Sequence, residues 1–381
     1  MANALQILTD GVEAGEDSLC KSFGSIEIEE SVDLPGAIEI SLPLDGTPAG
    51  DLTRLTDPSI QPYANLCLVA TAEEKPPECI FDGYVLSHKI HMETGTTSST
   101  LKVWGQDASW LMNLDERARE WIGMTDGGVA NEIFKEYGIT PASENTEDDS
   151  PAHTESGHTL MQRATDIQFL KQLARRNGKL CRVACADRPG ARIGYFGKPD
   201  LAAAPAVTLT LNPSTTATVH ALDFEWDVAR PSEVAAQQAL FSDPDPSAAR
   251  VETKDSGLPL LEARGLSDFI SPGLGSIQAM GDRKPKALLT TTVDDAGELA
   301  LRARSLLREA GFFVRCKGEA DVSQLKAVLR AGMVVQIDGA GSIHSGKYFV
   351  WSVRHTIQPR SHKMSFVLVR NAVGSPPPGG A

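Results

Sequence analysis

The period of the hydrophobic pattern changes twice along this chain, and that change limits the folds open to it. Before about residue 114, apolar and polar residues alternate, as in Ile26-Glu27-Ile28 and from Ile38 to Leu44. A period of two is typical of strands with one buried face. Pro35-Gly36 and the Gly-, Pro- and Asp-rich stretch 45–62 separate such runs. We therefore expect residues 1–114 to form one antiparallel β-domain, with further strands over 64–71, 80–92 and 99–104.

A helical period replaces the alternation in the middle of the chain. Asp126 is predicted to cap one helix, and Gly138 to end it. Thr165 or Asp166 is predicted to cap a second helix, which ends at Asn177-Gly178. Short strands are expected over 180–183 and 193–196. Residues 115–200 are thus predicted to form a small α+β domain.

Strand patterns return after residue 200. They cover 207–211, 218–226, 312–316, 333–337, 348–355 and 363–369. A helix is expected from Asp295 to Ala310, with Gly311 as its stop. Residues 230–290 are rich in Pro, Ser, Asp and Gly and are predicted to be irregular, with an Ala-rich helix around 233–240. The sequence therefore predicts a β-domain over 201–374 with an irregular and helical insertion at about 230–310, then a flexible tail, 375–381.

Charge and cysteine usage exclude some classes of function. The net charge is −14, so the surface should repel phosphate backbones and anionic lipids; binding to nucleic acid and insertion into a membrane are not expected. The start of the chain is acidic and lacks the basic-then-apolar order of a secretory signal, which predicts assembly in the cytoplasm. Six cysteines without a CxxC pair indicate reduced, mostly buried thiols.

One segment imitates a phosphate-binding loop. Gly341 to Lys347 matches GxxxxGK, but Tyr348 stands where Ser or Thr must hold Mg²⁺. A strand pattern follows Lys347, whereas a P-loop leads into a helix. We expect a β-hairpin with a Gly-rich turn and no nucleotide site.

The remaining candidate ligands do not form a site in the sequence. His88 and His91 lie on opposite faces of a predicted strand, and His153 and His158 lack a third ligand at suitable spacing. Cys181 and Cys185 share a strand face, which favours core packing. The acidic loop 144–149 lacks the order of a calcium loop. We therefore predict no catalytic, cofactor-binding or metal-binding residues, and no cofactor.

No GxSxG or HExxH motif is present, so the sequence favours a protein without enzymatic activity. Two alternatives remain open. A tail-associated cell-wall hydrolase would have two convergent carboxylates with shifted pKa values in a cleft. A stand-alone sugar- or protein-binding module would be a monomer with one concave pocket.

Four segments, in order, resemble the phage late-control D family of baseplate hub proteins, the hub part of VgrG-type spikes. The first is Ile80-Phe-Asp-Gly-Tyr-Val85, similar to the family's F-x-G-x-V strand. The second is Leu101-Lys-Val-Trp-Gly-Gln-Asp107, and the third is the helix from Thr165 to Gly178. The fourth runs from Gly332 through Gly346 and Val353-Arg-His355 to Arg370-Asn371. Residues 230–290 align with no part of the family's pattern.

The resemblance implies a mainly β fold with α+β insertions: two tube-like antiparallel β-barrel domains plus the small α+β domain. It also implies a homotrimer whose six barrels adapt a sixfold inner tube to a threefold spike. The chain stops where type VI spike proteins continue into a needle, so a separate spike protein is the expected partner, beside the inner tube protein and other baseplate components. The expected location is a phage-tail-like particle or virion of a contractile injection system, either released or attached to a membrane.

Overall fold

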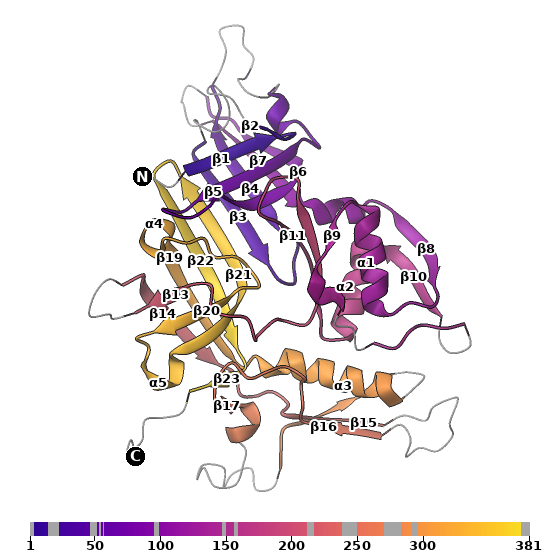
Figure 1. Ribbon diagram of the computed structural model, residues 1–381. Helices are drawn as coiled ribbons and strands as arrows, with labels where there is room; N and C mark the ends of the chain where they lie inside the picture. The colour runs from indigo at the N-terminus through magenta and orange to yellow at the C-terminus, as the bar shows by residue number, and fades with distance from the viewer. Residues whose placement is uncertain are drawn as a thin grey trace.

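The computed structural model describes residues 4–13, 23–45, 52, 55, 57–94, 99–146, 150–155, 159–211, 217–237, 250–269, 283–291 and 296–374. A large curled sheet runs through the structure, and the longer helices lie to one side of it (Figure 1). Cys20, His158, the end of the acidic loop and the tail 375–381 lie outside the described residues.

The N-terminal half of the sheet is built from strands that the alternation predicts, together with two that it does not. The strands are β1 (Ala4–Thr9), β2 (Val12–Glu13), β3 (Ser25–Ser31), β4 (Ala37–Pro43), β5 (Asn65–Thr71), β6 (Glu78–His91) and β7 (Thr100–Asp107). They lie in the order β3-β4-β7-β6-β5-β1-β2, and every pairing is antiparallel. The unpredicted β1 pairs with β5 near the edge of the sheet. Hydrogen bonds to β5 stabilise it as a strand although its own hydrophobic alternation is weak.

The C-terminal half of the sheet is also mainly antiparallel. Its strands are β13 (Thr208–Thr210), β14 (Val219–Trp226), β19 (Val314–Asp321), β20 (Val334–Asp338), β21 (Gly346–Gln358) and β22 (Ser361–Arg370). The path β14-β19-β22-β21 is antiparallel, and β20 pairs with β21 while β13 adds to β20 in parallel.

The two halves are hydrogen-bonded into one 13-stranded sheet. The join is the antiparallel pair β3–β21, which runs from Ser31↔Ser352 to Ile26↔Ile357. The expectation of a mainly β chain is therefore confirmed. Strand periodicity does not predict the join, because it says which face of a strand is buried and not which strand lies beside it.

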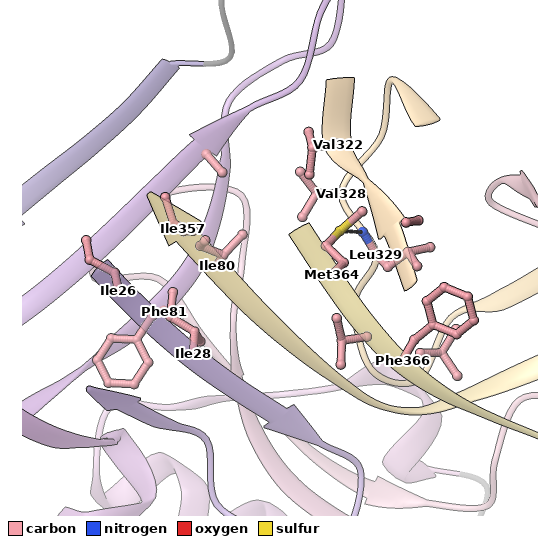
Figure 2. Packing of buried hydrophobic residues seen from close by; sticks show 14 of the residues in the cluster. Ile26, Ile28, Ile80, Phe81, Val322, Val328, Leu329, Ile357, Met364 and Phe366 are labelled. Atoms are coloured by element: carbon pink, nitrogen blue, oxygen red, sulfur yellow. Dashed lines mark hydrogen bonds between the residues drawn. The ribbon is translucent and has the colours of Figure 1, made fainter. Parts of the chain in front are cut away.

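One core runs beneath the join. Figure 2 shows Ile26 and Ile28 of β3 beside Ile80 and Phe81 of β6, with Ile357, Met364 and Phe366 from the last hairpin close by. The Met364 sulfur also accepts a hydrogen bond from the backbone N–H of Leu329 at 3.2 Å. Burying this much apolar surface from both ends of the chain ties them together, at roughly 25 cal/mol per Å² removed from water.

The middle of the chain contains both helices and strands and has a hydrophobic core of its own; we call it the α+β unit. Its elements are η3 (Ala108–Asn113), β8 (Glu116–Trp121), α1 (Asp126–Glu136), β9 (Thr140–Pro141), η4 (Ser143–Thr146), β10 (Leu160–Thr165), α2 (Asp166–Arg176), β11 (Leu180–Cys185) and β12 (Arg192–Gly197). Thr125, and not Asp126, caps α1 through its hydroxyl, because Asp126 is turned into a buried polar cluster. Thr165 is the N-cap of α2, and Gly138 follows α1 at φ +66°.

The prediction of an Ala-rich helix at 233–240 is wrong for 233–237, and 238–240 lie outside the described residues. Glu233–Gln237 is strand β15, between β16 (Arg250–Thr253) and β18 (Lys286–Leu289). Val234 and Ala236 alternate inward and pack against α3 (Ala296–Gly311), which lies along this small sheet (Figure 1). Packing against α3 outweighs the helix propensity of alanine. The described part of 230–290 is therefore more regular than its composition indicates.

Several short elements complete the chain. They are η2 (Pro58–Ile60), β17 (Arg264–Gly265), η5 (Leu266–Phe269), α4 (Val322–Leu325), α5 (Gly341–His344) and β23 (Ala372–Val373). Within the described ranges, no helix has both the length and the apolarity that crossing a membrane requires.

Candidate functional site

A cavity opens where the two sheet halves meet the α+β unit. Its volume is about 700 Å³. Glu30 of β3, Arg182 and Cys185 of β11, and Arg330 from the loop before β20 all line it. We call this space the junction cavity. Segments far apart in the chain, including residues 76–79 and 330–334, contribute its walls, so its shape depends on how they are assembled.

A buried ion pair lies at the base of the junction cavity. Arg330 donates from Nε to Glu30 Oε2 at 3.0 Å and from Nη2 to Oε1 at 2.9 Å. The Ala331 N–H also donates to Oε2, and the Arg182 guanidinium lies 3.8 Å from Oε1. Arg182 stacks on the Tyr195 ring at 4.5 Å. Both oxygens of Glu30 are therefore occupied, and the two cations hold three segments around one carboxylate.

Two carboxylates of this cavity have pKa values shifted in opposite directions. Burial would raise the pKa of Glu30, but the charge and hydrogen bonds of Arg330, with Arg182 behind it, hold that pKa below its usual range. Burial raises the pKa of Glu78, which also lines the cavity. Two neighbouring carboxylates with oppositely shifted pKa values can indicate acid–base catalysis. Glu30 is nevertheless fully used by Arg330 and Ala331, which leaves its oxygens no room to act as a base.

The cysteines fall into two environments. Cys181 and Cys316 are buried in apolar cores, where burial raises the pKa of each thiol to about 12. Cys67 is also buried, and burial together with the nearby Asp82 carboxylate raises the pKa of its thiol to about 12. Core packing is thus confirmed for Cys181. Cys185 of the same strand instead lines the junction cavity beside Cys79, and the Arg330 Nη2 lies 3.5 Å from its sulfur.

The segment that resembles a phosphate-binding loop is a hairpin connection, as predicted. Strands β20 and β21 are antiparallel, and β21 begins at Gly346. The single-turn helix α5 precedes Lys347 instead of following it. Tyr348 is fully buried and donates to the His344 carbonyl oxygen at 2.8 Å. Tyr348, at the position where a phosphate-binding loop has Ser or Thr, therefore stabilises the hairpin through this hydrogen bond.

His88 and His153 make hydrogen bonds inside the fold, while His91 is exposed. His88 and His91 belong to strand β6, and the His88 Nε2 lies 2.5 Å from the Ile60 carbonyl oxygen. His153 is buried against Asp126 at 2.7 Å, and Arg176 binds the same carboxylate. Burial would raise the Asp126 pKa, but His153 and Arg176 hold it below its usual range. Among the described residues, no three His, Cys, Asp or Glu side chains are grouped to hold a metal ion.

Two glycines of the sequence motifs let β6 and β7 approach closely. A Cβ on Gly83 would collide with the Gln106 backbone, and one on Gly105 would lie 2.6 Å from the Tyr84 carbonyl oxygen. Asp82, which belongs to the first of these motifs, pairs with Arg192 of β12 at 2.7 Å. Strand β6 therefore packs closely against β7 and also binds the α+β unit.

Sequence reasoning missed the Glu30–Arg330 pair. Nothing local distinguishes Glu30 from Glu27 or Glu29 except its parity in the strand, which points it toward the apolar face. The partner lies 300 residues away, and no spacing rule connects the two. A charged residue in phase with the buried side of a strand is the only signal that could have identified it.

The fold is that of phage tail proteins. The chain is similar to a tail protein from Neisseria meningitidis MC58 (14% identity, TM-score 0.66, 97% of each chain covered). It is similar to the 43 kDa tail protein of prophage MuSo2 from Shewanella oneidensis (14% identity, TM-score 0.66, 98% and 100% covered). It is also similar to a component of the E. coli type VI secretion system (14% identity, TM-score 0.57, 98% and 79% covered). At these identities the likeness is one of fold.

A family assignment comes from the sequence itself. The profile described as the Alg8 N-terminal domain matches residues 4–243, which is more than half of the chain, and the chain belongs to that family. No curated protein matches.

Proposed function

We propose that this protein is a structural hub of a phage-tail-like contractile injection system. The observation that carries the proposal is a match in fold to two tail proteins that covers nearly all of each chain. A likeness over a whole chain means that domain order and connections agree, and not merely one common module. The late-control D motifs occur in the expected order along the same fold.

The hub would be a homotrimer that adapts a sixfold inner tube to a threefold spike. Each subunit has two β halves related by similar construction, so three subunits can present six to the tube. Within this proposal, residues 1–114 and 201–374 are the two tube-facing domains and residues 115–200 are the α+β domain. The partners are the inner tube protein, a separate spike protein and other baseplate components. The hub acts without cofactor, metal or enzymatic activity, and it assembles in the cytoplasm.

The edges of the large sheet support ring formation. Strand β14 is at one end of the strand order and β2 is at the other. Val12 on β2 is 70% exposed, and Val228, just after β14, is 52% exposed. A closed ring needs two different surfaces on each subunit, one for each neighbour. Apolar side chains at two opposite edges meet that requirement.

Measurement of mass and shape tests the proposal. Light scattering after size exclusion should give three times the mass of the chain, and negative-stain images should show a threefold ring with an axial hole. Val12→Glu and Val228→Glu should each weaken the trimer. Leu288→Glu, at an equally exposed position on the small sheet, is the matched control. A chain that stays monomeric in solution would overturn the hub assignment.

A second candidate, a cell-wall hydrolase, is favoured only by the opposite pKa shifts of Glu30 and Glu78 in one cavity. Release of soluble fragments from purified peptidoglycan, abolished by Glu78→Gln, would support it. If the wild-type chain releases no fragments, the hydrolase proposal is excluded and only the hub proposal remains.

A further inference from the structure

Cys79 and Cys185 meet at the wall of the junction cavity although they come from different parts of the fold. Cys79 lies on β6 of the large sheet, and Cys185 ends β11 of the α+β unit. The Cys79 thiol donates to the Phe81 carbonyl oxygen at 3.4 Å. The Cys79 and Cys185 side chains both line the junction cavity and influence each other's pKa. Cys79 is fully buried, while Cys185 is partly exposed. Of the two residues, Cys185 is therefore the more accessible.

Arg330 holds both cysteines. Its Nη1 donates to the Cys79 carbonyl oxygen at 2.8 Å, and its Nη2 lies 3.5 Å from the Cys185 sulfur. The hydrogen bond from Cys79 and the charge of Arg330 lower the pKa of Cys185 against the effect of burial. The same hydrogen bond, together with burial, raises the pKa of Cys79. A partly exposed thiol with a lowered pKa beside a buried thiol with a raised pKa is the arrangement of a reactive dithiol.

We propose that Cys79 and Cys185 form a thiol–disulfide exchange site that takes a low-molecular-weight disulfide from the junction cavity and closes into an intramolecular disulfide. The cavity, at about 700 Å³, can admit a molecule of that size. The inference does not depend on the proposed function.

The reaction balances in two steps. The Cys185 thiolate attacks one sulfur of the small disulfide, forms a mixed disulfide, and releases one small thiolate, which takes a proton from water. Cys79 then loses its proton to solvent and attacks the Cys185 sulfur. The second small thiolate leaves and is protonated in turn. Two protein thiols are oxidised by two electrons, and one small disulfide is reduced to two thiols.

The new bond would fasten the α+β unit to the large sheet. It would close a long loop between β6 and β11 and restrict the unfolded chain. Cys181 and Cys316 lie in apolar cores, and Cys67 is buried beside Asp82; these three cysteines have no part in the exchange.

The test uses the full chain and oxidised glutathione as the probe. The folded wild-type protein is incubated near pH 8, quenched with iodoacetamide and mapped by mass spectrometry. We expect a Cys79–Cys185 linked peptide, a loss of two alkylatable thiols, and a higher denaturant midpoint that a reductant reverses. Cys181 and Cys316 should stay unreacted until the chain is unfolded.

Variants separate the two steps. Cys79→Ser should stop at a glutathione adduct on Cys185, Cys185→Ser should not react, and Cys181→Ser, on the same strand, should behave as wild type. Far-UV circular dichroism checks that each variant is folded. If a variant is not folded, the peptide map of the oxidised wild-type protein decides whether Cys79 and Cys185 become linked. A folded wild-type chain in which Cys79 and Cys185 remain unlinked, or in which Cys67 reacts first, would overturn the proposal.

Discussion

Arg330 binds Glu30 with two parallel hydrogen bonds, Nε to Oε2 at 3.0 Å and Nη2 to Oε1 at 2.9 Å, across 300 positions of the chain. Each side chain is only 12% exposed. The pair connects β3, in the first half of the sheet, to the loop that leads into β20 in the second half. Strand β3 also pairs with β21. The ion pair therefore lies beside the join between the two halves of the sheet and stabilises that join.

Removal of one partner of this pair should be costly. Glu30→Ala leaves Arg330 and Arg182 buried without their carboxylate, and we expect a loss of about 3–5 kcal/mol in the free energy of unfolding. Denaturant titration measures it. Glu29→Ala is the matched control, because Glu29 is the neighbouring residue and its pair with Arg354 is 55% exposed on both sides. That control should lose no more than about 1 kcal/mol. Equal losses in the two variants would contradict the role of the pair.

The buried histidine pair predicts acid sensitivity. His355 Nδ1 and His362 Nε2 lie 3.0 Å apart in the last hairpin, and burial lowers the pKa of His355 to about 3 and that of His362 to about 4. In the unfolded chain both rings titrate near 6.5. As the pH falls below that value the unfolded state binds protons first, so stability falls, by about 2 kcal/mol per ring at pH 5.

Unfolding free energies at pH 7 and pH 5 measure this effect. His355→Leu and His362→Leu together should flatten the dependence, because neither ring is left to titrate. His91→Leu, at a side chain that is 62% exposed, should leave it steep. A wild-type protein equally stable at both pH values would show that the pair is not buried and neutral.

Leu170 should be a packing residue of the α+β unit. It is fully buried on α2, in the core that also holds Ile133 and Phe134 of α1. Leu170→Ala leaves a cavity there, and we expect a loss of about 2–5 kcal/mol by denaturant titration. Gln172→Ala, on the exposed face of the same helix, should change stability little. A Leu170→Ala protein as stable as wild type would mean that this core is not packed as described.

Gly83 should tolerate no side chain. A Cβ there would meet the Gln106 backbone of β7 and the Phe81 ring, neither of which can move without distorting the sheet. Gly83→Ala should cost at least about 1–3 kcal/mol and lower the thermal midpoint. Gly24→Ala is a suitable control, because its nearest neighbour, the Ser41 carbonyl oxygen, lies at an ordinary 3.5 Å. A midpoint shift no larger than that of the control would argue against close approach at Gly83.

The sequence by itself determined the local elements. Alternation located the strands from β3 to β7 and from β19 to β22, and the helical period located α1, α2 and α3, because both patterns record which side of an element faces a core. The substitution of Tyr348 in a GxxxxGK segment was also readable, since the chemistry of a phosphate loop is set by neighbouring residues. The residue parity that buries Ile26 and Ile28 needs no tertiary information.

Only the tertiary structure decided which elements are neighbours. The pairing of β3 with β21, the strand at 233–237 and the meeting of Cys79 with Cys185 all depend on contacts between residues far apart in the chain. Periodicity fixes the buried face of a strand but carries no information about its partner, and propensity is weak enough for packing to reverse it. The charged and thiol groups of the junction cavity are therefore invisible in the sequence, because their environment exists only once three segments have folded together.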